Sequence, residues 1–278
     1  MLHKLCQTVA VLASAGTAFA GSALAADDQA CRVAEAGLSN QLEAYLDEAA
    51  RCVAQPPEGV TLRNDIEARL VAQINDRRAA AGEKPLRLRF GLYNAARLHA
   101  VDMAARGYAA HEDPEGRGHL QRARAIDRTA LFGAMGGNVA VLKPAEADQV
   151  DAKIAADPVN AANIRREEFT HMGVGVAEAG GRLYAVEVFA RVDGELRDPM
   201  PARVSRLDNV RPDFADNSFA METVRLENAA GDELGVSINS RLSGVALTGE
   251  TAYLDVSARG GDTVYTLYGP SVTASRDD

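Results

Sequence analysis

The first clear pattern along the chain is a pair of stretches whose apolar residues recur at helical spacing. The first stretch begins near Asn64 and has one apolar face, made of Ile66, Leu70, Val71 and Ile74. Asn64 with Glu67 three residues later resembles a capping box, and Gly82 is the expected stop signal. The second runs from about residue 92 to 106, stops at Gly107, and buries Leu92, Ala95, Ala96, His99 and Met103. The pattern predicts two amphipathic helices joined by an extended connector at residues 85–88.

Further along, the period of the pattern changes from helical to alternating. Residues 144–166 are typical of a helix that is interrupted at Asp157-Pro158. Residues 172–176 and 183–189 are β-prone, and the turn at residues 178–181 between them predicts a hairpin. Helices followed by strands, without regular βαβ alternation, predict an α+β layered domain over residues 58–198.

After Pro199 and Pro201 the chain changes character. Residues 203–278 have no convincing helical stripe, and their β-prone pieces lie at residues 219–226, 234–238, 245–247, 251–256 and 263–268. Turn signals such as Gly231-Asp232 and Gly260-Gly261 separate these pieces. This spacing predicts a small, sandwich-like all-β C-terminal domain. We expect it to offer a surface to a protein partner.

The first 25 residues resemble a signal peptide rather than part of the fold. Lys4 precedes an apolar run at residues 9–19, and Ala23-Leu24-Ala25 fits a cleavage site. The apolar run is too short to span a bilayer. A buried N-terminal helix is the alternative. The sequence therefore predicts export, to the periplasm or to the medium.

Composition narrows the classes of partner. The chain of 278 residues is 47% hydrophobic but has no Trp and only 5% aromatic residues, so Ala, Val, Leu and Ile must build its core. Its formal net charge is −9, and the loss of Lys4 with the signal peptide makes it −10. Because such a surface repels nucleic acid and anionic lipid headgroups, we expect neither as a partner.

Cysteine usage agrees with export. Cys6 would leave with the signal peptide, so that Cys31 and Cys52 remain. In an oxidising compartment an even pair predicts one disulfide, with two free thiols as the alternative. Closing a loop of about twenty residues would contribute roughly 3 kcal/mol. Residues 26–57 are thus expected to form an N-terminal helical segment held by one disulfide.

The densest motif lies between the second predicted helix and the hairpin. It reads His111-Glu-Asp-Pro-Glu-Gly116-Arg-Gly-His119-Leu-Gln-Arg122, and Gly136-Gly137-Asn138 follows it. With its flanking residues this motif resembles the bacterial branch of the CAP superfamily (cysteine-rich secretory protein, antigen 5 and pathogenesis-related-1), also called SCP-like. The resemblance covers about residues 65–192, and its matching positions are Asn75, Arg78, Gly82, Pro85, Leu86, Ala96, His99, Ala100, Asp102, Met103, Ala104, His111, Gly116, Arg122, Asn138, Val139, Ala140, Pro158, Asn163, Ile164, Phe169, Thr170, Gly173, Val174, Gly175, Tyr184 and Phe189.

The resemblance implies an α-β-α sandwich with a central antiparallel sheet and a cleft where two His and two acidic residues can hold a divalent metal. His111 matches the first His, whereas Gly137 stands where the family has Glu and Asn160 where it has the second His. Candidates for the remaining acid are Glu146, Asp148 and Asp151. Zinc and magnesium need three or more converging ligands. We therefore expect no metal and no cofactor, unless His171 and Glu168 substitute.

The other polar residues of this region have structural roles as alternatives to functional ones. His99, on an apolar face, is expected to be a satisfied core imidazole, and His119 is expected to be exposed in a loop. Asn138 would fix the backbone of the cleft, and Arg122 would bond carbonyls or an acid internally rather than bind an anionic ligand. Two acidic candidates for the cleft rim, each solvated by default, are Glu115 and Glu187.

The sequence has no Gly-x-Ser-x-Gly and no His-Glu-x-x-His motif, and the cysteines are predicted to be paired. We therefore interpret the chain as an exported CAP-domain binding or interaction protein of the cell envelope, with no catalytic residue. The residues expected to form its cleft are His111, Asn160, Asn138, His171, Glu168 and Arg122. The ligand would be small or lipid-like, a peptide or an envelope polymer. The opposing hypothesis is a metal-assisted hydrolase, protease-like or nuclease-like, with a rearranged cleft, and the third is a purely structural envelope protein.

Overall fold

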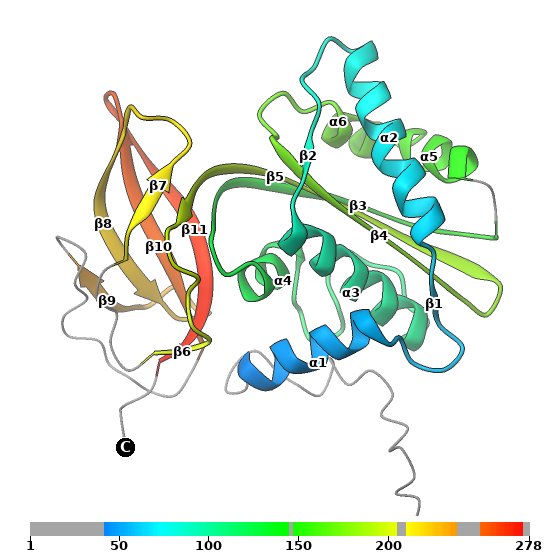
Figure 1. The fold of residues 1–278 in the computed structure, drawn as a ribbon, viewed down its shortest axis with the longest axis horizontal. Helices are drawn as coiled ribbons and strands as arrows, with labels where there is room; N and C mark the ends of the chain where they lie inside the picture. Colours follow the sequence, from blue (N-terminus) through cyan, green and yellow to red (C-terminus); the bar gives the residue numbers. More distant parts are fainter. Residues whose placement is uncertain (1–41, 145–146, 205–209, 238–250, 275–278) are drawn as a thin grey trace, which may run out of the picture.

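The computed structural model describes residues 42–144, 147–204, 210–237 and 251–274. The helices and strands over these residues are, in order, α1 Leu42–Ala54, β1 Thr61–Leu62, α2 Asn64–Ala80, β2 Arg87–Leu88, α3 Phe90–Arg106, α4 His119–Ile126, β3 Ala130–Leu142, α5 Ala147–Ala155, α6 Pro158–Ile164, β4 His171–Ala179, β5 Arg182–Leu196, β6 Arg203–Val204, β7 Pro212–Phe214, β8 Phe219–Glu227, β9 Glu233–Ser237, β10 Thr251–Gly260 and β11 Thr263–Ala274. Figure 1 shows helices around a central sheet, followed by a region of strands.

The N-terminal region has three layers (Figure 1). The middle layer is the antiparallel run β1–β4–β5–β3. Helices α3 and α4 cover one face of this run, and α2, α5 and α6 cover the other. Because alternate residues of a strand face opposite sides, β5 sends Val186 and Val188 toward α3 but Ala185 and Phe189 toward α2. The predicted α-β-α sandwich is therefore confirmed.

Both predicted amphipathic helices form, and α2 buries Ile66, Leu70 and Ile74 to 1% exposure or less. Gly107 ends α3 in the left-handed region, at φ 70°. The expected capping box is wrong, because no side chain caps the first turn of α2. Glu67 is buried instead and accepts hydrogen bonds from the Tyr93 hydroxyl (2.7 Å), the Arg97 guanidinium and the Val176 N–H (3.0 Å). This carboxylate ties α2 to α3 and β4.

Two glycines let α3 lie directly on β4. A Cβ at Gly173 would lie 2.2 Å from the carbonyl carbon of Leu92, and a Cβ at Gly175 would lie 2.4 Å from that of Ala96. Any side chain at these positions would push the helix off the sheet. The predicted hairpin therefore forms as β4 and β5, and its Gly-x-Gly spacing serves helix packing.

Strand β3 is not predicted by the sequence pattern. It pairs with β5 in antiparallel register from Ala130, opposite Glu195, to Leu142, opposite Leu183. Its centre is rich in small residues such as Gly136 and Gly137, which have low intrinsic strand preference. Pairing with β5, rather than the local sequence, makes this segment a strand.

The C-terminal region is all-β, as predicted, but its described strands lie in one sheet and not in two packed sheets, so the sandwich-like arrangement is wrong. Its strands run in the order β11–β10–β8–β9 and correspond to the β-prone pieces of the sequence, except that the piece at 245–247 lies outside the described residues. Their apolar residues, such as Val224, Leu254 and Leu267, pack in a core that also takes in Leu131 of β3 and Leu196 of β5. Strand β11 pairs with β3 at Tyr268 and Phe132, so the C-terminal sheet continues the central one.

A buried cation joins the two regions. Arg124 of α4 donates to the carbonyls of Gly269 (2.7 Å) and Leu254 (2.8 Å) and to the carboxylate of Asp255 (2.7 Å). The Tyr268 ring lies 5.5 Å from the guanidinium carbon. Both charged side chains are only 7% exposed. Burial of a charge is tolerated only with such complete pairing, so the C-terminal strands are bonded to α4 and not merely connected in sequence.

The N-terminal segment is described only from α1 onward. Residues 1–25 and Cys31 lie outside the described residues, so the signal peptide and the Cys31–Cys52 disulfide stay predictions. Cys52 is buried in a small core with Leu42, Tyr45 and Leu98, which packs α1 against α3. Within the described ranges no helix is both long and apolar enough to cross a bilayer.

Candidate functional site

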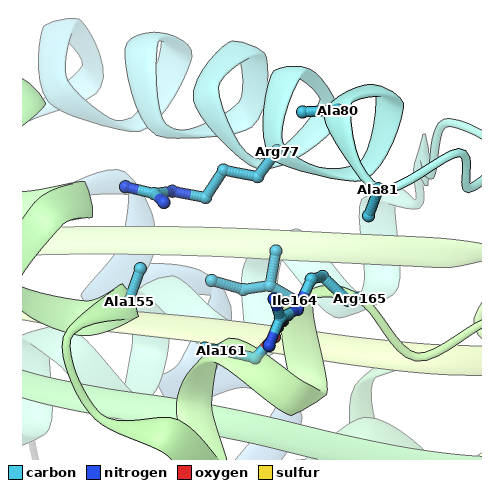
Figure 2. A pocket seen from close by; sticks show the side chains of 7 residues that line it. All are labelled: Arg77, Ala80, Ala81, Ala155, Ala161, Ile164 and Arg165. Atoms are coloured by element: carbon cyan, nitrogen blue, oxygen red, sulfur yellow. Dashed lines mark hydrogen bonds between the residues drawn. The ribbon is translucent and has the colours of Figure 1, made fainter.

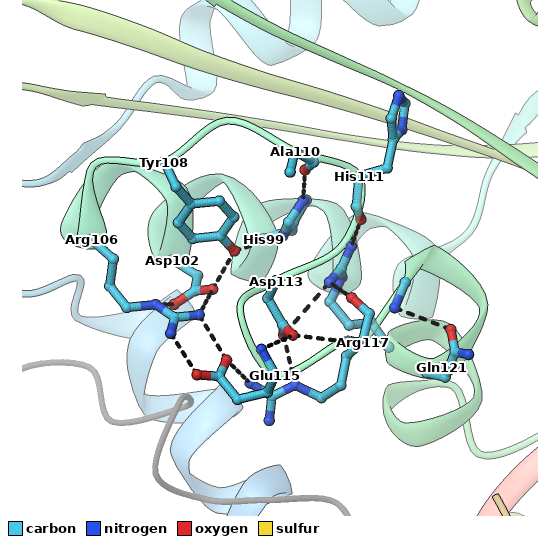
Figure 3. Close-up of polar contacts among 12 residues, drawn as sticks. His99, Asp102, Arg106, Tyr108, Ala110, His111, Asp113, Glu115, Arg117 and Gln121 are labelled. Carbon is cyan, nitrogen blue, oxygen red and sulfur yellow. Dashed lines mark hydrogen bonds and ion pairs between the residues drawn. The ribbon is translucent and has the colours of Figure 1, made fainter. Parts of the chain in front are cut away.

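A buried carboxylate organises the loop that carries His111 (Figure 3). Asp113 accepts hydrogen bonds from the backbone N–H groups of Glu115 (3.1 Å) and Arg117 (2.8 Å), and from Arg117 Nε (2.6 Å). The turn closes at Gly116, whose φ is 81° and whose N–H donates to the Asp113 carbonyl. The Asp-Pro-Glu-Gly motif is thus a tight turn built around its own aspartate.

Arg122, on α4, holds this loop in place. Its side chain is 2% exposed and donates to the backbone carbonyls of His111 (2.7 Å) and Arg117. Burial is the main cause that lowers the pKa of Arg122 below its usual value. Arg122 therefore positions His111 through its backbone and does not face the cleft as a ligand-binding cation.

The imidazole rings of His111 and His119 are in contact where this loop meets the sheet. His111 Nδ1 lies 3.1 Å from His119 Nε2, and the rings meet edge to face with centroids 5.3 Å apart. His111 is exposed, whereas the ring of His119 packs against Gly137 of β3. A Cβ at Gly137 would lie only 2.6 Å from His119 Nε2. The expectation that His119 is exposed is therefore wrong, because the missing side chain at position 137 lets its ring settle on the strand.

Burial keeps the His119 ring neutral. Desolvation, followed by the charge of Arg122, lowers the pKa of His119 well below its usual value. Its Nδ1 is shielded from solvent and has no hydrogen-bond partner among the described residues. A proton on that atom would be a buried N–H without an acceptor, so the favoured tautomer carries its proton on Nε2 and donates to His111. The pair can hydrogen-bond a ligand through the exposed ring of His111.

His99 lies behind this pair, with its ring centroid 5.7 Å from that of His119. It is buried, and its Nε2 lies 2.7 Å from the Ala110 carbonyl. Burial lowers the pKa of His99 to about 3. His99 is the satisfied core imidazole that its apolar helical face predicts, and it holds the end of the loop before His111.

The opposite face of β3 carries a separate polar network. Asn138 is fully buried, and its Nδ2 donates to Glu187 Oε2 (2.8 Å) and to the Asn160 carbonyl (3.2 Å). Asn163 donates to Asn138 Oδ1 (3.0 Å) and to the Gly137 carbonyl (3.2 Å). Asn138 thus ties α6 to the central sheet, a structural role. Asn160 enters this network through its backbone.

Glu187 is fully buried at the centre of that network, and the default expectation of a solvated carboxylate is wrong. Its Oε1 has no hydrogen-bond partner among the described residues. Burial raises the pKa of Glu187 to about 7, and the negative charge of Asp151 adds to the rise. The hydrogen bond from Asn138 and the charge of Arg77 oppose it. Glu187 therefore titrates near neutral pH inside the core.

The residues expected to form one cleft lie in three places. His111 is on the α4 side of β3, and Asn160 is on the α6 side. His171 starts β4, contacts the Thr170 hydroxyl at 2.9 Å, and lines a pocket with Arg87 and Glu195 among others, which His119 does not line. Burial is the largest cause that lowers the pKa of His171 to about 4.

Glu168 is likewise engaged elsewhere. Its carboxylate pairs with the guanidinium groups of Arg166 and Arg191, the latter at 3.2 Å. The structure therefore does not bring His171 or Glu168 to His111, and the proposed substitute ligand set does not assemble around that ring.

A pocket of about 320 Å³ adjoins the imidazole pair. Its lining residues come from α4, β3 and β11, and they are His119, Leu120, Ala134, Met135, Gly136 and Tyr268. The pocket opens where β3 and β11 diverge beyond the pairing of Phe132 with Tyr268. Its walls are largely apolar, and the Tyr268 phenol is the polar side chain among them that takes no part in the contact of the His111–His119 pair.

A second pocket, of about 310 Å³, lies between α2 and the α5–α6 pair (Figure 2). Arg77 reaches across the gap beneath α2, as the figure shows, but its guanidinium is held by Asp151, with Nε 2.8 Å from Oδ1. The other walls are mostly alanine and aliphatic. Its second cation, Arg165, donates to the Ala161 carbonyl at 3.2 Å, so both charged side chains of this pocket are engaged within the fold. The first pocket adjoins the imidazole pair and is therefore the better candidate site.

The residues around His111 do not fit a divalent metal. His119 occupies the space beside Gly137 where a larger side chain would have to lie, and Asp151, a candidate acid, pairs with Arg77 on the other face of the sheet. In the part of the chain that the structure describes, no group of three His, Cys, Asp or Glu side chains is arranged to hold a metal ion. Glu146 and the side chain of Asp148 lie outside that part.

The sequence pattern does not reveal the surroundings of two residues of the site, His119 and Tyr268, or those of Glu187 on the other face of the sheet. His119 looks like a loop residue, and only its pairing with a side-chain-free position on an unpredicted strand reveals its role. Tyr268 lies 149 positions from His119 in the chain, in a region that the sequence pattern predicts to be a separate domain. Glu187 could have been suspected from its place between Val186 and Val188, where a charged residue in a buried strand needs an explanation.

Comparisons with known proteins identify part of the chain. Residues 71–190 match the profile of the cysteine-rich secretory protein family, CAP. Among solved structures, an outer surface protein from Borrelia burgdorferi is similar with 15% identity and a TM-score of 0.41, over 46% of this chain and 93% of that one. An extracellular SCP-domain protein from Bacillus anthracis str. Ames is similar with 24% identity and a TM-score of 0.39, over 46% of this chain and 41% of that one. No curated protein matches the sequence.

Proposed function

We propose that this chain, whose residues 71–190 belong to the cysteine-rich secretory protein family, is an exported binding protein of the cell envelope. Its ligand is held without chemical change in the pocket beside the His111–His119 pair. The C-terminal strands belong to this site, because Tyr268 forms one of its walls. The signal-like segment at residues 1–25 supports export to the periplasm or the medium.

The observation that carries the proposal is the pocket itself. A volume of about 320 Å³ with largely apolar walls suits a small apolar group or an apolar side chain. The Tyr268 side chain in the wall and the exposed ring of His111, which His119 bonds, offer polar contacts at its edge. Hydrogen-bonding groups that are few and fixed in position favour selective binding.

The electrostatics favour binding over turnover. A general base near neutral pH needs a pKa close to 7 and a group that orients it. The pKa of His119 is far below that range, and His111 faces another imidazole rather than a carboxylate. The carboxylate with a pKa of about 7, Glu187, is sealed on the other face of the sheet. These residues therefore support capture of a ligand better than hydrolysis.

The test uses the mature protein and Nile red, a neutral apolar dye whose fluorescence rises in apolar surroundings. We expect saturable binding, and we expect Leu120→Trp, which fills the pocket, to weaken it about tenfold or more. Val159→Trp, at an exposed position of α6, is the matched control and should bind like the wild type. Equal binding by Leu120→Trp and the wild type, with both variants folded, would remove the pocket from the proposal.

A metal titration separates the binding protein from a metal-assisted hydrolase. Isothermal calorimetry with Zn²⁺ should show no tight stoichiometric site in the wild type, and His111→Ala should behave in the same way. Binding of one Zn²⁺ per chain that disappears in His111→Ala would favour the hydrolase instead.

A further inference from the structure

We propose that the ligand of this site is an extended peptide, which adds as an antiparallel strand to the open edge of β3 and places an apolar side chain in the pocket between His119 and Tyr268. The inference rests on the proposed function, because it names the occupant of the same site. Its support is independent of the pocket and comes from the hydrogen-bonding pattern of the sheet.

The direction of each backbone group in the sheet follows from two hydrogen bonds at the start of β4. The Thr170 N–H donates to the Ala190 carbonyl, and the Val192 N–H donates to the Thr170 hydroxyl, so even-numbered residues of β5 point their backbone groups toward β4. The odd-numbered residues of β5 must then point toward β3. In the observed register these pair with Gly136, Asn138 and Ala140.

The remaining residues of β3 consequently present their backbone to the side away from β5. These residues are Met135, Gly137, Val139 and Val141. An independent contact agrees, because the Gly137 carbonyl accepts a hydrogen bond from the Asn163 side chain, which belongs to α6 and not to the ladder. All four residues are half-buried, as expected of an edge that solvent can reach.

Among the described residues, strand β11 pairs with this side of β3 only at Phe132. Beyond that point the edge from Met135 to Val141 has no strand partner in the described ranges. Apart from the Gly137 carbonyl, which Asn163 bonds, this edge presents backbone donors and acceptors that have no strand partner. Such a row is a template for strand addition. The chain itself uses the same edge in this way, since β11 runs antiparallel to β3 where the two strands meet.

The surroundings of the edge favour a single strand over a second folded domain. His119 packs over Gly137 on one face, and Asn163 bonds the carbonyl of the same residue on the other. A domain that brought its own layers would have to displace both helices, whereas one extended chain is only a backbone wide. A second copy of this protein, which would pair β3 with β3, is therefore disfavoured.

Side-chain selectivity follows from the alternation of a strand. Residues of the added strand that face α4 meet His119, Leu120 and the Tyr268 ring, and one of them enters the pocket of about 320 Å³. The peptide should therefore carry an aliphatic or aromatic residue at that position. It should also lack Pro at the positions whose N–H groups bond β3.

The experiment selects linear random dodecapeptides displayed on phage against the full mature protein and then measures the synthetic winners by fluorescence anisotropy. N-methylation of alternate amides removes backbone donors on one side of a strand only. One peptide is methylated at its odd-numbered amides and a second at its even-numbered amides. We expect one of the two to bind about tenfold more weakly or worse, because it loses two or more hydrogen bonds to β3, and the other to change in affinity by less than about twofold. Equal effects of both parities would overturn strand addition.

A variant of the protein tests the same edge from the other side. Val139→Pro removes an N–H that faces away from β5, and Val139→Ala is its matched control, which keeps that N–H. We expect Val139→Pro to lose peptide binding and Val139→Ala to retain it. If Val139→Pro does not fold, the methylated peptides still decide the question.

Nile red distinguishes failure of this inference from failure of the proposed function. Dye binding without any enriched peptide would overturn the peptide as occupant and leave the pocket as a small-molecule site. Peptides that bind equally to Val139→Pro and to Val139→Ala, with Val139→Pro folded, would also overturn the inference. The absence of both dye binding and peptide binding would contradict both proposals.

Discussion

Replacement of Glu187 by Gln should change how the stability of this protein depends on pH. Glu187 is completely buried, and burial raises its pKa from 4.5 to about 7. The folded state therefore keeps a proton between pH 4.5 and 7 that the unfolded state has released. The contribution of this proton to the free energy of unfolding is fully present below pH 4.5 and is lost as pH rises through 7.

The size of the effect follows from the displacement of the pKa. A shift of about 2.5 pH units corresponds to about 3 kcal/mol at 1.36 kcal/mol per unit. Gln is close in shape to the protonated acid, can accept the Asn138 hydrogen bond through its oxygen, and carries no charge at any pH. We therefore expect the free energy of unfolding of Glu187→Gln, minus that of the wild type, to rise by about 3 kcal/mol from pH 4.5 to pH 8.

Urea unfolding followed by far-UV circular dichroism, at half-unit steps from pH 4.5 to 8, gives this difference directly. The two proteins must be compared at each pH because other groups also make stability depend on pH. The pKa of the buried ring of His171, for example, is lowered to about 4, which makes both proteins less stable as pH falls below 6.5. The control is Glu167→Gln, on the exposed turn before β4, which should run parallel to the wild type. A constant difference between Glu187→Gln and the wild type across this range would refute the reasoning.

Three other substitutions test the junctions around the site. Gly137→Ala should destabilise the protein by about 1–3 kcal/mol in urea unfolding, because its Cβ would overlap His119. The double variant with His119→Ala should recover much of this loss. An equally unstable double variant would contradict the packing of His119 on Gly137. Arg124→Met should lower the free energy of unfolding by about 3–5 kcal/mol in the same assay, because it leaves Asp255 buried and unpaired. Adding Asp255→Asn should restore part of this loss. An unchanged unfolding midpoint for Arg124→Met would disprove that Arg124 holds the C-terminal strands to α4. The pKa of His99 is lowered to about 3, so its stabilisation is complete above pH 6.5 and is lost as pH falls toward 3. His99→Gln should therefore be less sensitive to acid than the wild type by up to about 1.4 kcal/mol per pH unit, and equal acid sensitivity would argue against a neutral buried ring.

The site divides into a part that local sequence reveals and a part that it does not. Asp113 and Gly116 lie four residues or fewer from the groups to which they hydrogen-bond, so the Asp-Pro-Glu-Gly turn can be predicted from the local sequence. Asn138 has a structural role, as expected, but it ties α6 to the sheet on the face away from His111 and does not fix the backbone of a cleft there. His119 and Glu187, in contrast, have surroundings made by segments far away in sequence, and each was expected in solvent.

The sequence by itself determined the elements whose burial is periodic. The apolar faces of α2 and α3, the β4–β5 hairpin and the strands of the C-terminal region follow from residues within about one element, because a helix or a strand buries a regular set of its own positions. The positions that carry the family resemblance, matched over residues 71–190, depend on order and spacing and are also visible without a structure.

Only the tertiary structure decided the edges and junctions. Strand β3 exists because β5 pairs with it, not because its small residues prefer extension. Arg124 joins α4 to β10 across 131 positions of sequence, and Tyr268 reaches the pocket of His119 across a similar interval. The free energy of such contacts comes from pairs that no local window contains, so a pattern of burial predicts which faces are covered but not which partner covers them.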